Sequence, residues 1–380
     1  MHQYQKTNRY FAQIADGREE LGSEELLELN AKNIKTAYRG IYFDADKATL
    51  YRINYSARLI SRVLAPIKTF QCHSTDYLYK TAFSINWTDF FSVDQTFAIF
   101  SQVSNSNIRH SQYASLRLKD AIVDSFRESF GKRPDVNRES PDVWFNLHID
   151  KNRAVIHFDT SGGSLHKRGY RSQTVEAPMQ ETLAAAIIRY SGWDGEKPLY
   201  DLMCGSGTLL TEAVMSYCRI SPGRLRVKFG FENLPDFDRD IWDTVKKKEN
   251  SNIRNLPQGL VRGCDLSEKA VAATKNNMSN ISEGKQITVI RQDFRKIENL
   301  EDYVIVCNPP YGIRIGNEQN LVPLFEDLGS FLKEKCKGSS AYIYFGNKNL
   351  IKNIGLRASW KKPLKGGGLD GVLVKYEIFK

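Results

Sequence analysis

The sequence lacks closely spaced cysteine pairs of the C-x-x-C type. The six histidines also show no ligand spacing such as H-x-x-x-H. Disulfide-stapled folds and structural zinc sites both depend on such spacings. The six cysteines are dispersed without any C-x-x-C pair: Cys72, Cys204, Cys218, Cys264, Cys307 and Cys336. We therefore expect reduced, packed thiols and no bound metal.

Long apolar runs are absent as well. No stretch approaches the ~20 apolar residues that a membrane-spanning helix needs, and the first residues, MHQYQKTNRYFAQIADG, lack the apolar core of a secretory signal. A hydrophobic content of 41% with 26% charged residues is typical of a soluble globular protein. At 380 residues the chain has room for two or three domains. We expect a cytoplasmic protein.

Acidic residues are too few to balance the basic ones, and the formal net charge is +10. Residues 151–171 hold five basic residues and one acidic residue, and residues 351–380 hold seven and two, so these stretches supply +4 and +5 of the total. A basic balance can serve solubility alone. Its concentration in two stretches favours an anionic partner with a phosphate backbone.

The first 60 residues show strand and helix patterns in the order βαββαβ. This order is typical of a ferredoxin-like segment, which says little about function because many unrelated proteins share it. A mixed α+β region follows, with a long amphipathic helix, SQYASLRLKDAIVDSFRESF, and two strands, VWFNLHID and RAVIHFDT, around the turn KN. We expect the first segment over residues 1–60 and an overlapping region over 44–160.

A Gly-rich basic stretch, SGGSLHKRGYR, has no apolar periodicity and is expected to be the linker at the domain boundary. After it, helices alternate with short apolar strands such as PLYDLM, LVRGCD, ITVIR and DYVIVC. Such alternation predicts an α/β domain with a doubly wound parallel sheet. We expect this domain over residues 161–380.

Each of four strands in this domain is followed by a polar tip. The first strand leads into D-x-x-C-G-S-G-T, which has neither the lysine of a Walker A loop nor the G-x-G-x-x-G of a dinucleotide fold. A single acid at a strand end is often only a helix N-cap. Four tips at the carboxyl edge of one parallel sheet predict a ligand site. They are Asp201, Asp265, Asp293 and Asn308.

These motifs together resemble the class I S-adenosylmethionine (SAM)-dependent methyltransferases. The resemblance implies a Rossmann-like domain with SAM as its cofactor. It further implies that the Gly-rich loop faces the amino acid part of SAM, that Asp265 bonds the ribose hydroxyls, and that Asp293 bonds the adenine amine. The implied cofactor-binding set is Asp201, Cys204, Gly205, Gly207, Thr208, Asp265, Leu266, Asp293, Phe294 and Asn308.

In that family an N-P-P-Y motif marks methylation of a nitrogen conjugated to a planar system. Such an amine is a poor nucleophile because its lone pair is delocalised. We expect the Asn308 side-chain oxygen and the Pro309 carbonyl to accept its two hydrogens, which localises the lone pair and stabilises the charge that grows on nitrogen. Pro309 and Pro310 fix the turn, and Tyr311 offers a face for a flipped base. These four residues are the predicted catalytic set.

Four classes of amine are methylated through this motif: guanine N2 of RNA, adenine N6 of DNA, cytosine N4 of DNA, and glutamine side chains. The N-terminal region resembles a THUMP domain. The blocks SGGSLHKRGYR, EAPMQETLAAAII, DLMCGSGTLLTEAV, SPGRLRVKFGFENLPDFD and NPPYGIRIG resemble those of bacterial THUMP-containing RNA guanine-N2-methyltransferases that act on large-subunit ribosomal RNA.

The resemblance implies RNA as partner and a single methyltransferase domain in these 380 residues. Two alternatives stay open, a tRNA guanine-N2-methyltransferase and an RNA-binding protein with a degenerate methyltransferase domain. Phosphate contacts position a nucleic acid without reading its bases. From the basic linker we expect RNA contacts by Lys167, Arg168 and Arg171.

Overall fold

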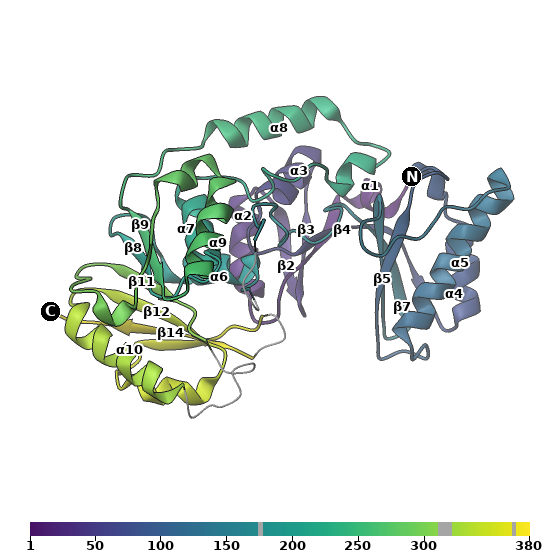
Figure 1. The fold of residues 1–380 in the computed structure, drawn as a ribbon. Helices are drawn as coiled ribbons and strands as arrows, with labels where there is room; N and C mark the ends of the chain where they lie inside the picture. Colours follow the sequence, from purple (N-terminus) through teal and green to yellow (C-terminus); the bar gives the residue numbers. More distant parts are fainter. Residues whose placement is uncertain (174–177, 311–320, 367–369) are drawn as a thin grey trace. The chain divides into compact units, whose positions relative to one another are not determined.

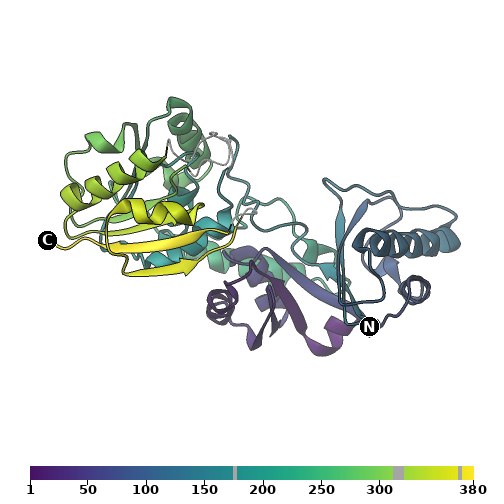
Figure 2. The same cartoon turned by 90° about the horizontal axis from the view of Figure 1, so that it is seen from below.

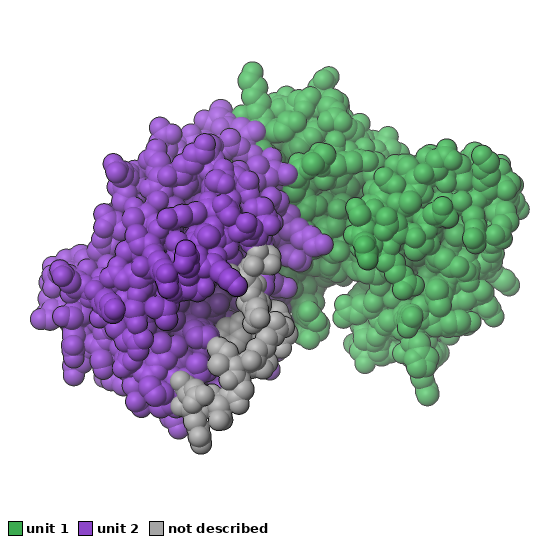
Figure 3. Space-filling view, in the orientation of Figure 1, with its two compact units in different colours: residues 1–14, 22–165, 226–247 green, residues 15–21, 166–225, 248–380 purple. Residues whose placement is uncertain are grey.

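Two compact units make up the protein (Figure 3). Unit 1 comprises residues 1–14, 22–165 and 226–247, and unit 2 comprises residues 15–21, 166–225 and 248–380. The computed structural model describes residues 1–173, 178–310, 321–366 and 370–380, so Tyr311 lies outside the described residues. Within these ranges no helix is both long and apolar enough to cross a membrane.

The predicted βαββαβ order is confirmed at the start of unit 1. A short helix, α1 (Gln3–Thr7), precedes it and was not predicted. The six elements are β1 (Arg9–Gln13), α2 (Glu19–Glu28), β2 (Lys32–Ala37), β3 (Gly40–Asp44), α3 (Lys47–Ser56) and β4 (Arg62–Gln71). Asp46 starts α3, because its side chain accepts a hydrogen bond from the Thr49 amide.

The rest of unit 1 extends the same sheet. Strand β4 pairs with β1 on one side and β7 on the other, which gives a single seven-stranded sheet in the order β2-β3-β1-β4-β7-β6-β5. Helices α4 and α5 lie side by side next to β5 and β7 (Figures 1 and 2). The added elements are α4 (Thr75–Phe83), β5 (Phe97–Ser104), α5 (Ser111–Phe130), β6 (Val143–Asp150) and β7 (Arg153–Asp159).

The predicted turn KN joins β6 and β7 as a two-residue hairpin. Lys151 and Asn152 both have positive φ, 48° and 60°. Positive φ at both central residues is the signature of a type I′ turn, whose twist matches that of the flanking strands.

A segment from the second half of the sequence belongs to unit 1. Residues 226–247 carry an aromatic group that packs on α3: Phe231 stacks on Tyr51 at 4.4 Å between ring centroids, and Trp242 meets Tyr55 edge-on at 5.3 Å. A single boundary at the linker, residues 161–171, therefore does not separate the two compact units, because residues 226–247 belong to unit 1. Apolar burial between sequence-distant segments produces this arrangement, and linker composition does not reveal it.

Unit 2 contains a second seven-stranded sheet, in the order β10-β9-β8-β11-β12-β14-β13. Pairing is parallel from β10 to β12 and antiparallel for β14 and β13. The strands are β8 (Leu199–Asp201), β9 (Val261–Asp265), β10 (Thr288–Arg291), β11 (Val304–Cys307), β12 (Ser340–Phe345), β13 (Trp360–Pro363) and β14 (Val372–Glu377). The predicted doubly wound sheet is confirmed, and the antiparallel pair is an addition.

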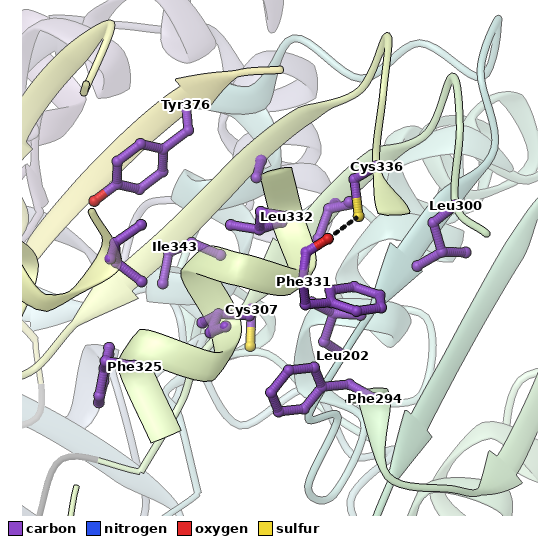
Figure 4. Packing of buried hydrophobic residues seen from close by; sticks show 14 of the residues in the cluster. Leu202, Phe294, Leu300, Cys307, Phe325, Phe331, Leu332, Cys336, Ile343 and Tyr376 are labelled. Carbon is purple, nitrogen blue, oxygen red and sulfur yellow. Dashed lines mark hydrogen bonds between the residues drawn. The ribbon is translucent and has the colours of Figure 1, made fainter. Parts of the chain in front are cut away.

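Helices cover both faces of this sheet. On one face α10 packs on a buried apolar cluster that includes Phe325, Phe331 and Ile343 (Figure 4). On the other face Leu210 of α7 touches Gly263 of β9. The helices of unit 2 are α6 (Glu181–Ser191), α7 (Thr208–Tyr217), α9 (Glu268–Ser279) and α10 (Val322–Lys335). Most of α8 (Arg239–Ser251) belongs to unit 1. Helix α8, which begins within unit 1, was not predicted, because Trp242 and Val245 are its only buried residues.

All six cysteines are buried and none forms a disulfide. Burial raises the pKa of Cys264 and of Cys336 to about 12, so both thiols stay protonated at neutral pH. The expectation of packed thiols is confirmed.

Candidate active site

The order of the strands places the site. From β8 the chain moves outward through β9 to β10, and then returns to the other side of β8 as β11. In open α/β sheets ligands bind at such a reversal, beyond the carboxyl ends of the strands. Asp201 ends β8 beside Val306 of β11, and Asn308 follows directly after β11. Two of the four predicted tips thus flank the reversal point.

The Gly-rich loop after β8 is closed by hydrogen bonds to its neighbours. The Cys204 amide donates to the Cys264 carbonyl at 2.9 Å, and the Gly207 amide donates to the Cys204 carbonyl at 2.8 Å. Gly205 and Gly207 have positive φ, 55° and 79°. A Cβ atom at Gly207 would lie 2.6 Å from Cγ2 of Thr274 on α9. Both glycines are therefore required by the shape of the loop.

Asp265, at the tip of β9, is tied to this loop. Its Oδ2 atom accepts a hydrogen bond from the Gly205 amide at 2.9 Å, and its Oδ1 atom accepts one from the Ser267 amide at 2.9 Å. The side chain is still partly exposed. The next residue, Leu266, leaves 65% of its surface exposed. An accessible carboxylate beside an exposed apolar side chain fits the sugar and base of a nucleoside.

Asp293, beyond β10, combines a local role with a candidate binding role. It caps the short helix η4 (Phe294–Lys296) by accepting from the Arg295 amide, and the Arg295 guanidinium also pairs with it at 2.6 Å. This pairing holds the pKa of Asp293 below its usual range. Phe294 is different, because its ring is buried against Phe331 of α10 at 5.4 Å. The structure therefore directs the Phe294 side chain into the core, and only its backbone can face a cofactor.

Asp201 is almost fully buried, and its Oδ1 atom accepts a hydrogen bond from the Met203 amide at 3.2 Å. Burial raises the pKa of this carboxyl to about 8, and the nearby charge of Asp265 adds to the effect. Strongly shifted acids in a strand-end crevice are typical of functional sites. A cationic ligand group near Asp201 would favour its ionised form.

Asn308 carries the most informative atom of the site. Its Oδ1 atom is buried and has no hydrogen-bond partner within the described ranges. A buried acceptor without a partner is costly, by about 1–3 kcal/mol, and is rare in folded proteins. Pro309 is buried beside it and Pro310 is exposed. The side chain is thus held ready to accept a hydrogen from a ligand.

The predicted RNA contacts of the linker are not supported for two of the three residues. Arg168 is 1% exposed and pairs with the buried Glu212 of α7 at 3.3 Å. Arg171 pairs with Glu181 of α6 at 3.2 Å and donates to Oγ1 of Thr208 at 3.0 Å. Both guanidinium groups serve the fold of unit 2 instead. Lys167 is exposed, and its RNA contact stays a prediction.

Two residues of α9 support the site and were not predicted. Thr274 donates to the Gly205 carbonyl at 2.8 Å, and Asn277 donates to the Ser206 carbonyl at 3.0 Å. Asn277 also accepts hydrogen bonds from the Ser172 and Gln173 amides. The signal was present in the sequence, because both polar residues share the buried face of α9 with Ala270, at spacings of four and seven. Thr208, at the start of α7, is likewise buried, and its Oγ1 atom accepts a hydrogen bond from Arg171.

The residues present fit S-adenosylmethionine. The backbone of the loop has positive φ at Gly205 and Gly207, Asp265 offers a carboxylate for hydroxyl groups, and the Asn308 acceptor has no partner among the described residues. When bound, SAM supplies the electrophilic methyl group. Among the described residues, no group of three or more His, Cys, Asp or Glu side chains could hold a metal ion.

Known families match three successive segments of the chain. They are described as the RlmL ferredoxin-like domain over residues 9–64, the THUMP domain over residues 72–159, and the RMKL-like methyltransferase domain over residues 168–375. These matches agree with the resemblance that the sequence motifs indicated.

Two curated relatives are similar along nearly the whole chain. The first, slr0064 of Synechocystis sp. (strain ATCC 27184 / PCC 6803 / Kazusa), is named provisionally as an RNA methyltransferase and is 39% identical over 98% of this chain and 97% of its own length. The second is the ribosomal RNA large subunit methyltransferase K/L of Photobacterium profundum, which is 37% identical over 98% of this chain. The chain spans about half, 53%, of that relative's length.

Solved structures share the fold. A methyltransferase-like protein, SMU.472, crystallised with SAH, has a TM-score of 0.85 at 24% identity, with 98% of this chain and 99% of that chain covered. A predicted N6-adenine-specific DNA methylase from Listeria monocytogenes str. 4b F2365 has a TM-score of 0.84 at 25% identity, with 98% and 97% covered. By its matched domains and its relatives, this chain belongs to the RMKL-like family of SAM-dependent methyltransferases.

Proposed function

We propose that the protein transfers a methyl group from SAM to the exocyclic N2 amine of a guanosine in large-subunit ribosomal RNA. The observation that carries this proposal is the buried Oδ1 atom of Asn308, an acceptor without a partner among the described residues, directly after β11. An exocyclic amine is a donor of the kind that this atom lacks.

The side chains of the site would act through the target amine. Asn308 Oδ1 and the Pro309 carbonyl each accept one of its hydrogens, which turns the nitrogen lone pair toward the methyl group. These acceptors gain strength as positive charge develops on nitrogen, so they favour the transition state over the ground state. Burial of the Asn308 Oδ1 atom keeps competing water away from this acceptor. Tyr311 is proposed to stack on the flipped base.

The choice of ribosomal RNA is supported by a relative, and the choice of guanine N2 rests on the resemblance of the sequence motifs. The relative from Photobacterium profundum is named for large-subunit ribosomal RNA, and the THUMP match is shared with RNA-modifying enzymes by resemblance. Transfer RNA is the alternative within RNA. DNA adenine is a further alternative, because one solved structure of the same fold is described as a predicted N6-adenine-specific DNA methylase.

Product analysis tests the proposal. The protein would be incubated with SAM and, in parallel, with large-subunit ribosomal RNA, transfer RNA and DNA from a strain that lacks the gene. Digestion to nucleosides and mass spectrometry should detect N2-methylguanosine in the ribosomal sample. Its appearance in transfer RNA alone would favour the alternative, and N6-methyladenine in DNA would overturn the assignment of guanine.

A further inference from the structure

Two aromatic rings lie side by side on one face of the ferredoxin-like part of unit 1. Phe11 of β1 is directly opposite Tyr42 of β3 in the antiparallel register, and their ring centroids are 4.8 Å apart. Gly40 of β3 makes room for this pair, because a Cβ atom there would lie only 2.0 Å from the Phe11 ring. Phe11 is partly exposed and Tyr42 is 38% exposed. The rings are therefore on the surface.

The opposite face of the same strands is covered. Ile41, next to Tyr42, points to the other side of the sheet, where its Cδ1 atom would lie 2.9 Å from a Cβ atom built at Gly22 of α2. Helix α2 carries five glutamates and no basic residue. We call the side that bears Phe11 and Tyr42 the open face, because both rings are partly exposed there.

Basic residues surround the two rings. The Arg9 guanidinium lies over the Tyr42 ring, 5.6 Å from its centroid, and Lys35 of β2 is opposite Tyr42 in register. Residues 9–13 and 32–44 together hold four basic residues, Arg9, Lys32, Lys35 and Arg39, and one acid. That acid, Asp44, is already bonded by Arg9 and Asn33. The open face thus combines apolar rings with positive charge.

We propose that the open face binds unpaired nucleotides of the RNA substrate, with bases stacked on Phe11 and Tyr42 and phosphates near Lys35 and Arg9. A duplex keeps its bases stacked on one another, so only a single-stranded segment can use the rings. The exposed Tyr38, at 76% in the β2–β3 turn, extends the aromatic surface. The inference rests on the proposed function only in taking RNA as the nucleic acid.

Binding of two RNA probes tests this inference. One is a labelled 12-nucleotide single strand without self-complementarity, and the other is the same strand annealed to its complement. In the chain of 380 residues, the double variant Phe11→Leu with Tyr42→Leu should raise the dissociation constant for the single strand roughly 5- to 100-fold, the effect of losing one stacked base. Affinity for the duplex should not change.

Matched variants separate stacking from general damage. Tyr42→Phe keeps the ring and should bind like the wild type. Tyr113→Leu removes a tyrosine of comparable exposure from α5, 52%, and should also bind like the wild type. Thermal melting and SAM binding report whether each variant is folded. Where the double variant does not fold, crosslinking of the wild type to a 5-iodouridine strand, mapped by mass spectrometry, should find Phe11 or Tyr42.

Several outcomes would overturn the inference. They are wild-type affinity of the folded double variant for the single strand, an equal loss on both probes, or crosslinks confined to other segments. A change of oligomeric state in the double variant, without a change in RNA affinity, would instead assign the open face to contacts between copies of the chain. Because no methyl transfer is measured, a failure of the proposed reaction would leave these results intact.

Discussion

Asp265 and Gly205 are joined by a hydrogen bond of 2.9 Å, from the Gly205 amide to the Oδ2 atom of Asp265. The acid at the tip of β9 therefore holds the glycine loop that follows β8. One carboxylate thus has two tasks, since it shapes the loop and is also expected to bond the ribose of SAM. A substitution that keeps its shape but removes its charge can separate the two tasks.

Asp265→Asn should weaken SAM binding while leaving the loop in place. The amide oxygen can still accept from Gly205, although the amide nitrogen cannot accept from Ser267. Each bond to the ribose falls from the roughly 1.5–3 kcal/mol of a bond to a charged group to the roughly 0.5–1.5 kcal/mol of a neutral one. Isothermal titration should therefore show a dissociation constant raised roughly 10- to 100-fold. Asp302→Asn, which changes an acid ahead of β11 at the opposite edge of the sheet, is the control. Unchanged affinity in Asp265→Asn would remove this residue from the cofactor site.

Gly207→Ala should impair cofactor binding by distorting the loop. The residue has φ of 79°, and the new Cβ atom would lie 2.6 Å from Cγ2 of Thr274. Positive φ alone costs a non-glycine residue roughly 1–2 kcal/mol. Adding Thr274→Ser removes the clashing methyl group but keeps the hydroxyl that bonds the Gly205 carbonyl. SAM affinity should recover in part in the double variant, and no recovery would argue against the clash.

Asp201 should make the stability of unit 2 depend on pH. Its pKa is about 8 in the folded protein and ~3.9 in an unfolded chain, so between these values the folded state holds a proton that the unfolded state has released. The free energy of unfolding therefore falls as pH rises through this window, by at most about 1.4 kcal/mol per pH unit. Asp201→Asn cannot ionise and should lack this part of the slope.

Denaturant titrations of the wild type and Asp201→Asn at pH 5.5, 7 and 8.5 measure the difference. Other titrating groups are the same in both proteins and cancel. The stability of the variant relative to the wild type should increase with pH. A constant difference would mean that Asp201 ionises normally despite its burial.

Arg168→Met should destabilise the protein rather than change its RNA binding. The guanidinium is buried with Glu212, and removal of one partner of a buried ion pair leaves an uncompensated charge at a cost of about 3–5 kcal/mol. Replacing Glu212 by Met as well should restore much of this loss. Lys167→Met, at the exposed neighbour, should leave stability unchanged and lower the salt dependence of RNA binding. If Arg168→Met left stability unchanged and weakened RNA binding, Arg168 would be an RNA contact after all.

Local patterns in the sequence predicted much of this fold, and long-range burial set the remainder. Helices α5 and α9 occupy the predicted residues, because their apolar spacing is regular and Ser267 caps α9 through the Ala270 amide. The strand tips were also predictable from local sequence, because each short apolar run ends at a polar residue. The burial of Arg168 depends on Glu212, and the position of residues 226–247 depends on contacts with Tyr51. Both partners are distant in sequence, so composition cannot reveal these contacts.

The last prediction concerns Asn308, whose buried Oδ1 atom lacks a partner within the described part of the chain. Asn308→Ala removes an acceptor that the folded protein does not use internally, so thermal stability and SAM affinity should change little. The target amine would lose the acceptor that strengthens as charge develops on it. Single-turnover methyl transfer should therefore slow by about 100-fold or more, the usual effect of removing one preorganised polar group from an active site.

Asn308→Asp provides the matched comparison. It keeps an oxygen acceptor in the same position but adds a negative charge near Asp201, whose own carboxyl is already difficult to ionise. We expect it to retain more activity than Asn308→Ala at low pH, where the new carboxyl is protonated in part, and to change SAM affinity more. N2-methylguanosine formed by Asn308→Ala at the wild-type rate would contradict the mechanism, because the amine would then need no acceptor from this side chain.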